Sequence, residues 1–196
     1  MFRILEPSQG WIKIDGEDIS NMGIATLRNK LSIIPQDPVL FTGTLRTNLD
    51  PFYKCSDRDV WKAIKLAHLT PFVSQQKEGL QLAICNGGSN LSAGQRQQVC
   101  LARALLQKSK ILVLDEATAA VDLATDTLIQ ETIQNEFSDC TIITIAHRIS
   151  TVMESDTIIV LENGKMVEMD TPEVLIKNKQ GIFHSLAVTS GYFIKK

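Results

Sequence analysis

The hydrophobic and polar positions of this chain switch between two periods, alternation and helical spacing. Alternation over residues 11–14 before an Asp-Gly pair predicts a strand and a turn. Residues 1–6 and 23–30 have helical spacing, and the apolar run at 31–34 predicts a strand. From about residue 45 to residue 110 the helical period dominates, which predicts a helical insertion in a strand–helix pattern.

Inside this insertion the pattern predicts helices separated by a loop. An amphipathic helix is expected over 57–68, a short one over 70–74 and a long one over 92–106. Ser92 is a suitable N-cap for the long helix. The Asn-Gly-Gly-Ser run at 86–89 predicts the loop before it.

After the insertion, strands and helices alternate again. We expect a strand at 111–115, a helix at 123–137 and a second strand at 141–146. The second strand lacks polar alternation, as expected of a parallel strand that is buried on both faces. A hairpin with a Glu-Asn-Gly turn and two helices complete the pattern, at residues 157–168, 171–177 and 181–188.

Together these elements predict one α/β domain spanning residues 1–196. Residues 1–44 and 111–196 would form its core, and residues from about 45 to 110 an inserted helical subdomain. A chain of 196 residues buries roughly 70% of its unfolded surface, which suffices for one hydrophobic core.

Charge and cysteine usage narrow the possible functions. Twenty basic residues against 22 acidic ones give a net charge of −2, which argues against a nucleic-acid partner held by a basic surface. Four scattered cysteines without a C-x-x-C pair indicate neither zinc nor disulfides, and they fit a reducing cytosolic compartment. No apolar run approaches the roughly 18 residues of a membrane span, and no signal peptide is evident. We therefore expect a soluble segment that another segment or polypeptide would hold at any membrane.

Two adjacent carboxylates end the strand predicted at 111–115. Asp115 would lie at the carboxyl edge of a parallel sheet, where ligands bind in such folds, and can hold Mg²⁺ through water. Glu116 points elsewhere and can act as a general base on a water molecule. A strand that ends in two solvated acids is common, so the pair alone also allows a purely structural interpretation.

Two further side chains follow strands at the same predicted edge. Gln36 comes after the strand at 31–34, and its amide can coordinate a metal ion or water. His147 comes after the strand at 141–146 and can bond a γ-phosphate and the attacking water. A residue of either type at the end of a strand more often has a structural role. The functional interpretation depends on both side chains lying at the same sheet edge as Asp115.

The start of the long helix offers an anion site. Ser92 supplies a hydroxyl, Gly94 allows close approach to the backbone, and a helix N-terminus favours anions. An ordinary capped helix would explain Ser92 alone, but the fused Leu-Ser-Ala-Gly-Gln-Arg-Gln run at 91–97 favours phosphate binding.

With these residues in order, the chain resembles the nucleotide-binding domain of an ABC transporter over essentially its whole length. Gln36 is similar to the family's Q-loop glutamine, and Asp115 and Glu116 to its Walker B aspartate and catalytic glutamate. Asp122 resembles the D-loop aspartate, and His147 the switch histidine. The signature motif matches Leu91, Ser92, Ala93, Gly94 and Gln95.

The resemblance implies a RecA-like P-loop NTPase core with the helical subdomain of ABC proteins inserted, and ATP and Mg²⁺ as cofactors. Asp115 and Gln36 would hold the metal ion, and Glu116 and His147 would act in hydrolysis. Gln36, Asp122 and the signature residues would contact nucleotide. A second nucleotide-binding domain and transmembrane domains, at the cytosolic face of a membrane, are the implied partners.

Three segments narrow the resemblance to subfamily C, the multidrug resistance-associated proteins: residues 34–41, 48–52 and 99–106. Glu116 and the Leu-Ser-Ala-Gly-Gln form resemble the second, C-terminal domain of those proteins. The implied function is ATP hydrolysis coupled to export of organic anions, conjugates or drugs.

The phosphate-binding loop G-x-x-x-x-G-K-[ST] (Walker A) does not occur in the sequence. In the family this loop lies just before the helix that residues 1–6 match, so we expect an N-terminally truncated domain that begins shortly after it. The alternative is a catalytically inactive truncated domain that binds or regulates a partner ABC domain. A chromosome-maintenance or translation-factor ATPase is a weaker interpretation, and long coiled-coil heptads, which would mark the former, do not occur.

We expect the 196-residue chain alone to bind no Mg-ATP measurably. Hydrogen bonds to charged groups contribute about 1.5 kcal/mol or more each, so losing four of them costs roughly 6 kcal/mol, or about 10⁴-fold in affinity. Isothermal titration calorimetry with Mg-ATP measures this directly. A micromolar Kd contradicts the expectation.

Overall fold

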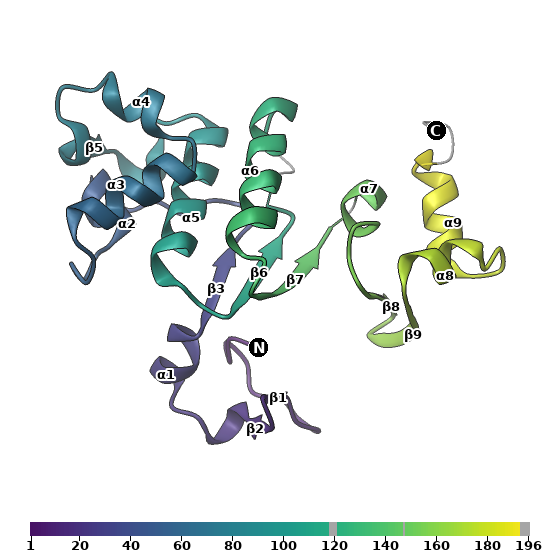
Figure 1. Cartoon of the computed structure of the whole chain (residues 1–196). Coiled ribbons are helices and arrows are strands. Elements are labelled where there is room, and N and C mark those ends of the chain that lie inside the picture. Colours follow the sequence, from purple (N-terminus) through teal and green to yellow (C-terminus); the bar gives the residue numbers. More distant parts are fainter. Residues whose placement is uncertain (118–120, 147, 193–196) are drawn as a thin grey trace. The chain divides into compact units, whose positions relative to one another are not determined.

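The computed structural model describes residues 1–117, 121–146 and 148–192 (Figure 1). Internal contacts divide the chain into two compact units, residues 1–143 and residues 144–196. The boundaries expected above for core and helical subdomain stay a prediction. Within the described residues, no helix combines the length and apolar character that a membrane crossing requires.

The first unit begins with a short hairpin and a helix, as the sequence predicts. Strands β1 (Lys13–Ile14) and β2 (Glu17–Asp18) pair antiparallel around a turn with Gly16 at a φ of 84°. A 3₁₀ turn, η1 (Ile19–Asn21), leads into helix α1 (Ile24–Asn29). Leu27 of α1 is fully buried, which fixes this segment to the sheet that follows.

The prediction of a helix at residues 1–6 is wrong, because this segment has an irregular conformation. The Arg28 side chain instead donates hydrogen bonds to the carbonyls of Phe2 and Arg3. Arg3 in turn donates to the carbonyls of Ile19 and Met22. A segment this short depends on tertiary contacts for its conformation, and these hydrogen bonds hold residues 1–6 in an irregular one.

A parallel strand pair forms the centre of the first unit. Strands β3 (Leu31–Ile34) and β6 (Ile111–Asp115) pair in parallel, with Ile34 opposite Leu114. Strand β7 (Thr141–Ile145) follows β6 in the sheet order β3-β6-β7. Because β3 and β6 are parallel, their carboxyl ends reach the same edge of the sheet, as predicted from the sequence.

The prediction that the strand at 141–146 is buried on both faces is wrong. Ile142 and Ile145 of β7 are 37% and 53% exposed. Strand β7 ends the sheet order among the described strands, and an edge position leaves side chains with fewer covering neighbours. The apolar sequence of this strand therefore did not reveal its exposure.

The expected helices of the insertion form between β3 and β6. Helix α5 (Ala93–Gln107) contacts both α2 (Leu45–Leu49) and α3 (Asp57–Leu66), which Figure 1 shows beside it. The antiparallel pairing of strand β4 (Gly43–Thr44) with strand β5 (Ala83–Ile84) was not predicted. The remaining elements of the first unit are α4 (Thr70–Ser74), η2 (Gly79–Gln81), η3 (Asn86–Gly88) and α6 (Leu123–Glu136).

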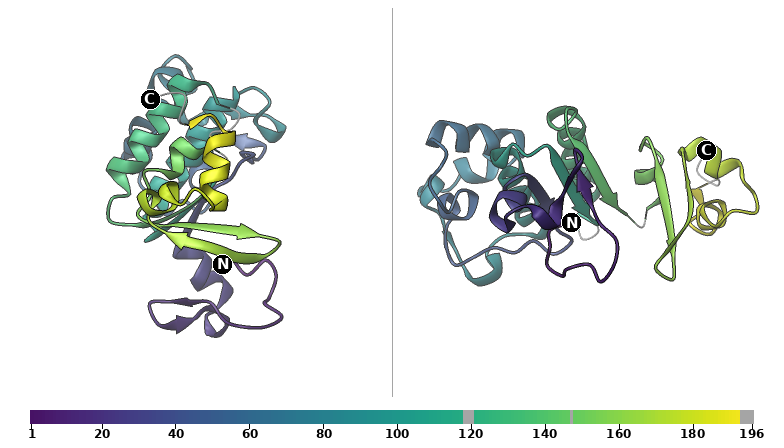
Figure 2. Two further views of the ribbon diagram at one scale, coloured as in Figure 1. Left: turned by 90° about the vertical axis from the view of Figure 1, so that its right-hand side faces the viewer. Right: turned by 90° about the horizontal axis from the view of Figure 1, so that it is seen from below.

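The second unit is built on the predicted hairpin, whose ribbon Figure 2 shows in two views. Strands β8 (Ile158–Glu162) and β9 (Lys165–Asp170) are joined by Asn163 and Gly164, both at positive φ. Positive φ at both positions is what a two-residue hairpin turn requires. Helices α7 (Ile149–Val152), α8 (Pro172–Lys177) and α9 (Ile182–Thr189) accompany it, the last two as predicted.

A buried ion pair stabilises the start of the helical segment. Arg46 and Asp50 are 4% and 6% exposed, and Arg46 Nη1 lies 3.2 Å from Asp50 Oδ2. Burial acts to raise the pKa of Asp50, but backbone amides of Cys55 and Lys54 and the Arg46 guanidinium bond the carboxylate and hold its pKa below the ordinary value. Ionised Asp50 therefore stabilises the folded chain.

We expect Asp50→Asn to lower the free energy of unfolding by about 3 kcal/mol, because it leaves Arg46 with a buried, weakened partner. Since the pKa of Asp50 is lowered on folding, its contribution is complete above the ordinary aspartate pKa and is lost as pH falls through the folded value. Urea unfolding at several pH values measures both effects.

The matched control is Asp57→Asn. Asp57 also bonds Arg46, at 2.8 Å, but its side chain is 72% exposed, so we expect a loss below about 1 kcal/mol. Equal losses in the two variants, or an unchanged acid dependence in Asp50→Asn, contradict this assignment.

Candidate functional site

The carboxyl ends of β3 and β6 bring together two of the residues singled out from the sequence. Ile34 lies opposite Leu114, so the chain continues into Gln36 on one strand and Glu116 on the other. Gln36 Nε2 donates a hydrogen bond of 3.0 Å to Glu116 Oε2, across 80 residues of sequence. Asp115 ends β6 at this edge and is half-buried. The structure thus places Gln36, Asp115 and Glu116 at one edge, and their roles remain predictions.

Glu116 has an uncommon backbone conformation. Its φ is 46°, in the left-handed region that residues other than glycine rarely adopt. Such conformations persist where the surrounding structure requires them, and they gather at functional sites. The turn redirects the chain directly after β6, and Glu116 meets Gln36 there.

The oxygen donors at this edge suit a magnesium ion. Mg²⁺ keeps several waters and needs only one or two protein carboxylates when phosphate oxygens complete its shell. Asp115 provides such a carboxylate, and the amide of Gln36 gives its nitrogen to Glu116, which leaves Oε1 as an acceptor. Among the described residues no three His, Cys, Asp or Glu side chains cluster as a metal site. Asp115 and the Gln36 amide thus offer two oxygen donors of the kind that Mg²⁺ accepts.

Helix α5 anchors the loop that carries Gln36 through a residue that the sequence analysis missed. Gln97 is 1% exposed, and its Nε2 donates a hydrogen bond of 3.1 Å to the carbonyl oxygen of Pro35. The available signal was spacing, because Gln97, Leu101 and Ala104 occupy one buried stripe of α5. A polar residue at a core position of a helix indicates a buried hydrogen-bonding partner.

The same loop is held at two further points. Arg103 of α5 donates from Nη1 to the carbonyl of Val39 at 2.7 Å and from Nε to the carbonyl of Asn48 at 2.6 Å. The Asn48 side chain bonds both the amide and the carbonyl of Phe41. Helices α5 and α2 therefore fix the loop after Gln36, while Val39 and Phe41 themselves remain exposed.

The first turn of α5 is closed by a capping box. Ser92 Oγ accepts from the Gln95 amide at 3.1 Å, and Gln95 Oε1 accepts from the Ser92 amide at 2.9 Å. This confirms Ser92 as the N-cap. The cap uses Ser92 Oγ as an acceptor, so the hydroxyl can also donate its proton to an anion. Ala93 is the half-buried first residue of the helix.

Gly94 lies where α5 approaches the start of α6. A Cβ atom at Gly94 would lie 3.3 Å from Thr125 Cγ2 and 3.7 Å from Val121 Cγ1. Close packing therefore supplies a structural reason for glycine, beside the phosphate approach expected from the sequence.

Asp122 caps helix α6. Its carboxylate accepts from the Thr125 amide at 3.0 Å and from the Thr125 hydroxyl at 2.8 Å. These hydrogen bonds, the backbone one first, hold the pKa of Asp122 below its ordinary value. Its nucleotide contact stays a prediction. His147 lies outside the described residues, so its place beside Asp115 also stays a prediction.

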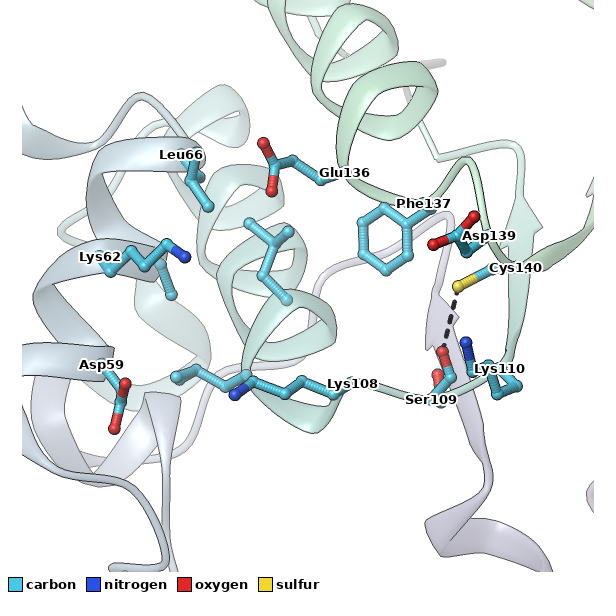
Figure 3. Close-up of a pocket in the computed structure, with 13 residues that line it drawn as sticks. Asp59, Lys62, Leu66, Lys108, Ser109, Lys110, Glu136, Phe137, Asp139 and Cys140 are labelled. Carbon is cyan, nitrogen blue, oxygen red and sulfur yellow. Dashed lines mark hydrogen bonds between the residues drawn. The ribbon is translucent and has the colours of Figure 1, made fainter.

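A cavity of about 300 Å³ lies at the other end of the strands (Figure 3). Lys110 and Cys140, which line it, immediately precede β6 and β7, whereas Asp115 ends β6. Three lysines and three acids surround it, and Cys140 Sγ donates to the Ser109 carbonyl at 3.2 Å. The cavity is therefore separate from the edge that carries Gln36 and Glu116.

We expect Ser92→Ala to lower the free energy of unfolding by about 1 kcal/mol, because it removes the N-cap of α5. Ser92→Asn supplies a side-chain oxygen at the same position and should restore most of this loss. Urea denaturation of the three proteins provides the comparison. If Ser92→Ala unfolds at the same urea concentration as the parent, the cap contributes nothing and the assignment fails.

Comparison with known proteins places these features in context. A family model described as "ABC transporter" matches residues 1–119. The chain is 60% identical over 191 residues to ATP-binding cassette sub-family C member 2 of Rattus norvegicus. It is 55% identical over 191 residues to sub-family C member 3 of Homo sapiens. Each alignment covers 97% of this chain and 12% of the relative, so the chain spans a small part of the curated proteins it matches.

Two further matches also cover nearly all of this chain but only a part of the other protein. Multidrug resistance protein mrp-7 of Caenorhabditis elegans is 54% identical over 183 residues, which cover 93% of this chain and 12% of that protein. Among solved structures, a bacterial Atm1-family ABC exporter with ATP bound superposes with a TM-score of 0.89 at 36% identity. That match covers 96% of this chain and 33% of the exporter chain, and the parallel sheet described above is consistent with a RecA-like NTPase core.

Proposed function

The chain belongs to the ABC transporter family, and we propose that it is the second, C-terminal ATP-hydrolysing domain of a subfamily C exporter. The observation that carries this proposal is the 3.0 Å hydrogen bond between Gln36 and Glu116, at the strand edge that ends in Asp115. The sequence identity of the chain to its subfamily C relatives exceeds 50%, which supports the choice of subfamily.

The residues at this edge would divide the work of hydrolysis. Asp115 and the Gln36 amide oxygen would hold Mg²⁺, which would supply charge neutralisation at the phosphates of bound ATP. Glu116 accepts a proton from the attacking water as the new bond to the γ-phosphorus forms and the bond to ADP breaks. Gln36 orients the Glu116 carboxylate through its Nε2, and His147 bonds the γ-phosphate.

The first turn of α5 would serve a second nucleotide. Ser92 can donate its hydroxyl proton to a phosphate oxygen while its lone pair caps the helix. We propose that Ser92, Ala93, Gly94 and Gln95 face the ATP of a partner nucleotide-binding domain, with Asp122 beside them. Transmembrane domains of the same transporter are the second partner, and export of organic anions, conjugates or drugs across the membrane, from its cytosolic face, is the coupled process.

We expect Glu116→Gln to lower ATP hydrolysis by the native polypeptide at least 100-fold, because a general base contributes that much to the rate. ATP binding should persist, since the amide keeps the shape of the carboxylate. Measurement requires steady-state ATPase assays and nucleotide-binding assays on purified native protein in lipid.

The matched control is Glu131→Gln, the same chemical change at an exposed position of α6. We expect its activity to equal that of the parent. If hydrolysis by Glu116→Gln also equals that of the parent, the chain is not a hydrolytic site. The alternative, a module that binds or regulates a partner ABC domain, would then take the place of this proposal.

A further inference from the structure

Gln97 is a polar side chain in an apolar environment. It is 1% exposed, and its neighbours on the buried side of α5 include Val99, Cys100 and Leu101. Burying an amide is costly unless it is hydrogen-bonded, and Gln97 donates to the carbonyl oxygen of Pro35 at 3.1 Å. The position is therefore explained by its partner and not by packing.

That partner sets the direction of the next residue. The carbonyl oxygen of Pro35 and the amide nitrogen of Gln36 belong to one rigid peptide plane. Proline also fixes its own φ near −65°, which removes one of the remaining rotations. A donor that holds the Pro35 oxygen thus holds the peptide from which the Gln36 side chain extends.

Gln36 in turn contacts Glu116, at 3.0 Å. Two hydrogen bonds therefore connect the interior of α5 to the carboxylate assigned as the base. We propose that Gln97 is a positioning residue for ATP hydrolysis, which keeps Gln36 directed at Glu116 and ties its position to that of α5. This inference rests on the proposed function.

Helix α5 also carries the signature residues, so it links them to this edge. Ser92 caps the helix five residues before Gln97, about 7.5 Å along the axis at 1.5 Å per residue. A continuous helix of 15 residues moves as a rigid rod over such a distance. If phosphate on a partner domain shifted the first turn of α5, Gln97 would shift with it and alter the contact of Gln36 with Glu116.

The far end of α5 provides a matched comparison. Gln107, the last residue of the helix, donates from Nε2 to the carbonyl of Leu31 at 2.8 Å. Leu31 begins β3, whereas Pro35 follows its end. The two glutamines thus tie the same helix to the two ends of β3, Gln107 at its first residue and Gln97 at Pro35, directly after its last.

The test replaces each glutamine with methionine, which keeps the length of the side chain and introduces no charge. We measure kcat and KM for ATP on the native polypeptide in lipid, with its full set of domains. We expect Gln97→Met to lower kcat about tenfold while KM changes less than twofold. Gln107→Met should leave both values within twofold of the parent, because its bond lies away from Glu116.

A double variant separates positioning from general loss of structure. If Gln97 acts through Gln36, then Gln97→Met added to Gln36→Ala should lower kcat less than twofold further, since coupled residues are not additive. Arg103 still anchors the loop at Val39 in each variant, so the segment stays folded. This non-additivity, with the unequal effects of the two methionine variants, supports the inference.

Two results would overturn the positioning role of Gln97. Both can be distinguished from a failure of the proposed function. Equal effects of Gln97→Met and Gln107→Met assign Gln97 a structural role alone, as does a full tenfold loss added to Gln36→Ala. In both cases the parent still hydrolyses ATP, so the proposed function stands. A parent protein without ATP hydrolysis overturns both proposals together.

Discussion

The parallel register of β3 with β6 is the constraint on which the rest of this chain depends. Ile34 lies opposite Leu114. This pairing allows Gln36 to bond Glu116 and places Asp115 at the same edge of the sheet. A shift of one residue would turn every side chain of β3 to the other face of the sheet. The intervening helices therefore have to return the chain to a position defined within one residue.

Much of this arrangement was accessible from the sequence, because local signals and the fold agree. The apolar runs of β3 and β6 and the cap of α5 are each defined by neighbouring residues. The turn at Asn163 and Gly164 is another such case. The edge that collects Gln36 and Glu116 was predictable as well, since parallel strands order their carboxyl ends alike.

The features that sequence reasoning missed depend on contacts distant in the chain. Residues 1–6 have helical spacing, but the carbonyls of Phe2 and Arg3 accept hydrogen bonds from Arg28 instead. Strand β7 is apolar along its length, and its exposure follows from its place in the sheet order and not from its composition. Gln97 looks like an ordinary polar helix residue until Pro35, 62 positions away, is placed against it.

The two glutamines of α5 also require the length of the helix to match the length of strand β3. Ten residues of helix separate Gln97 from Gln107, about 15 Å, and four residues of strand separate Leu31 from Pro35, about 13 Å. Deleting one helical residue would turn one end of α5 by about 100° relative to the other, and both amides could no longer reach the strand. A length change inside α5 would therefore break one of these two contacts, whereas a length change in a loop of the helical segment would leave both in place.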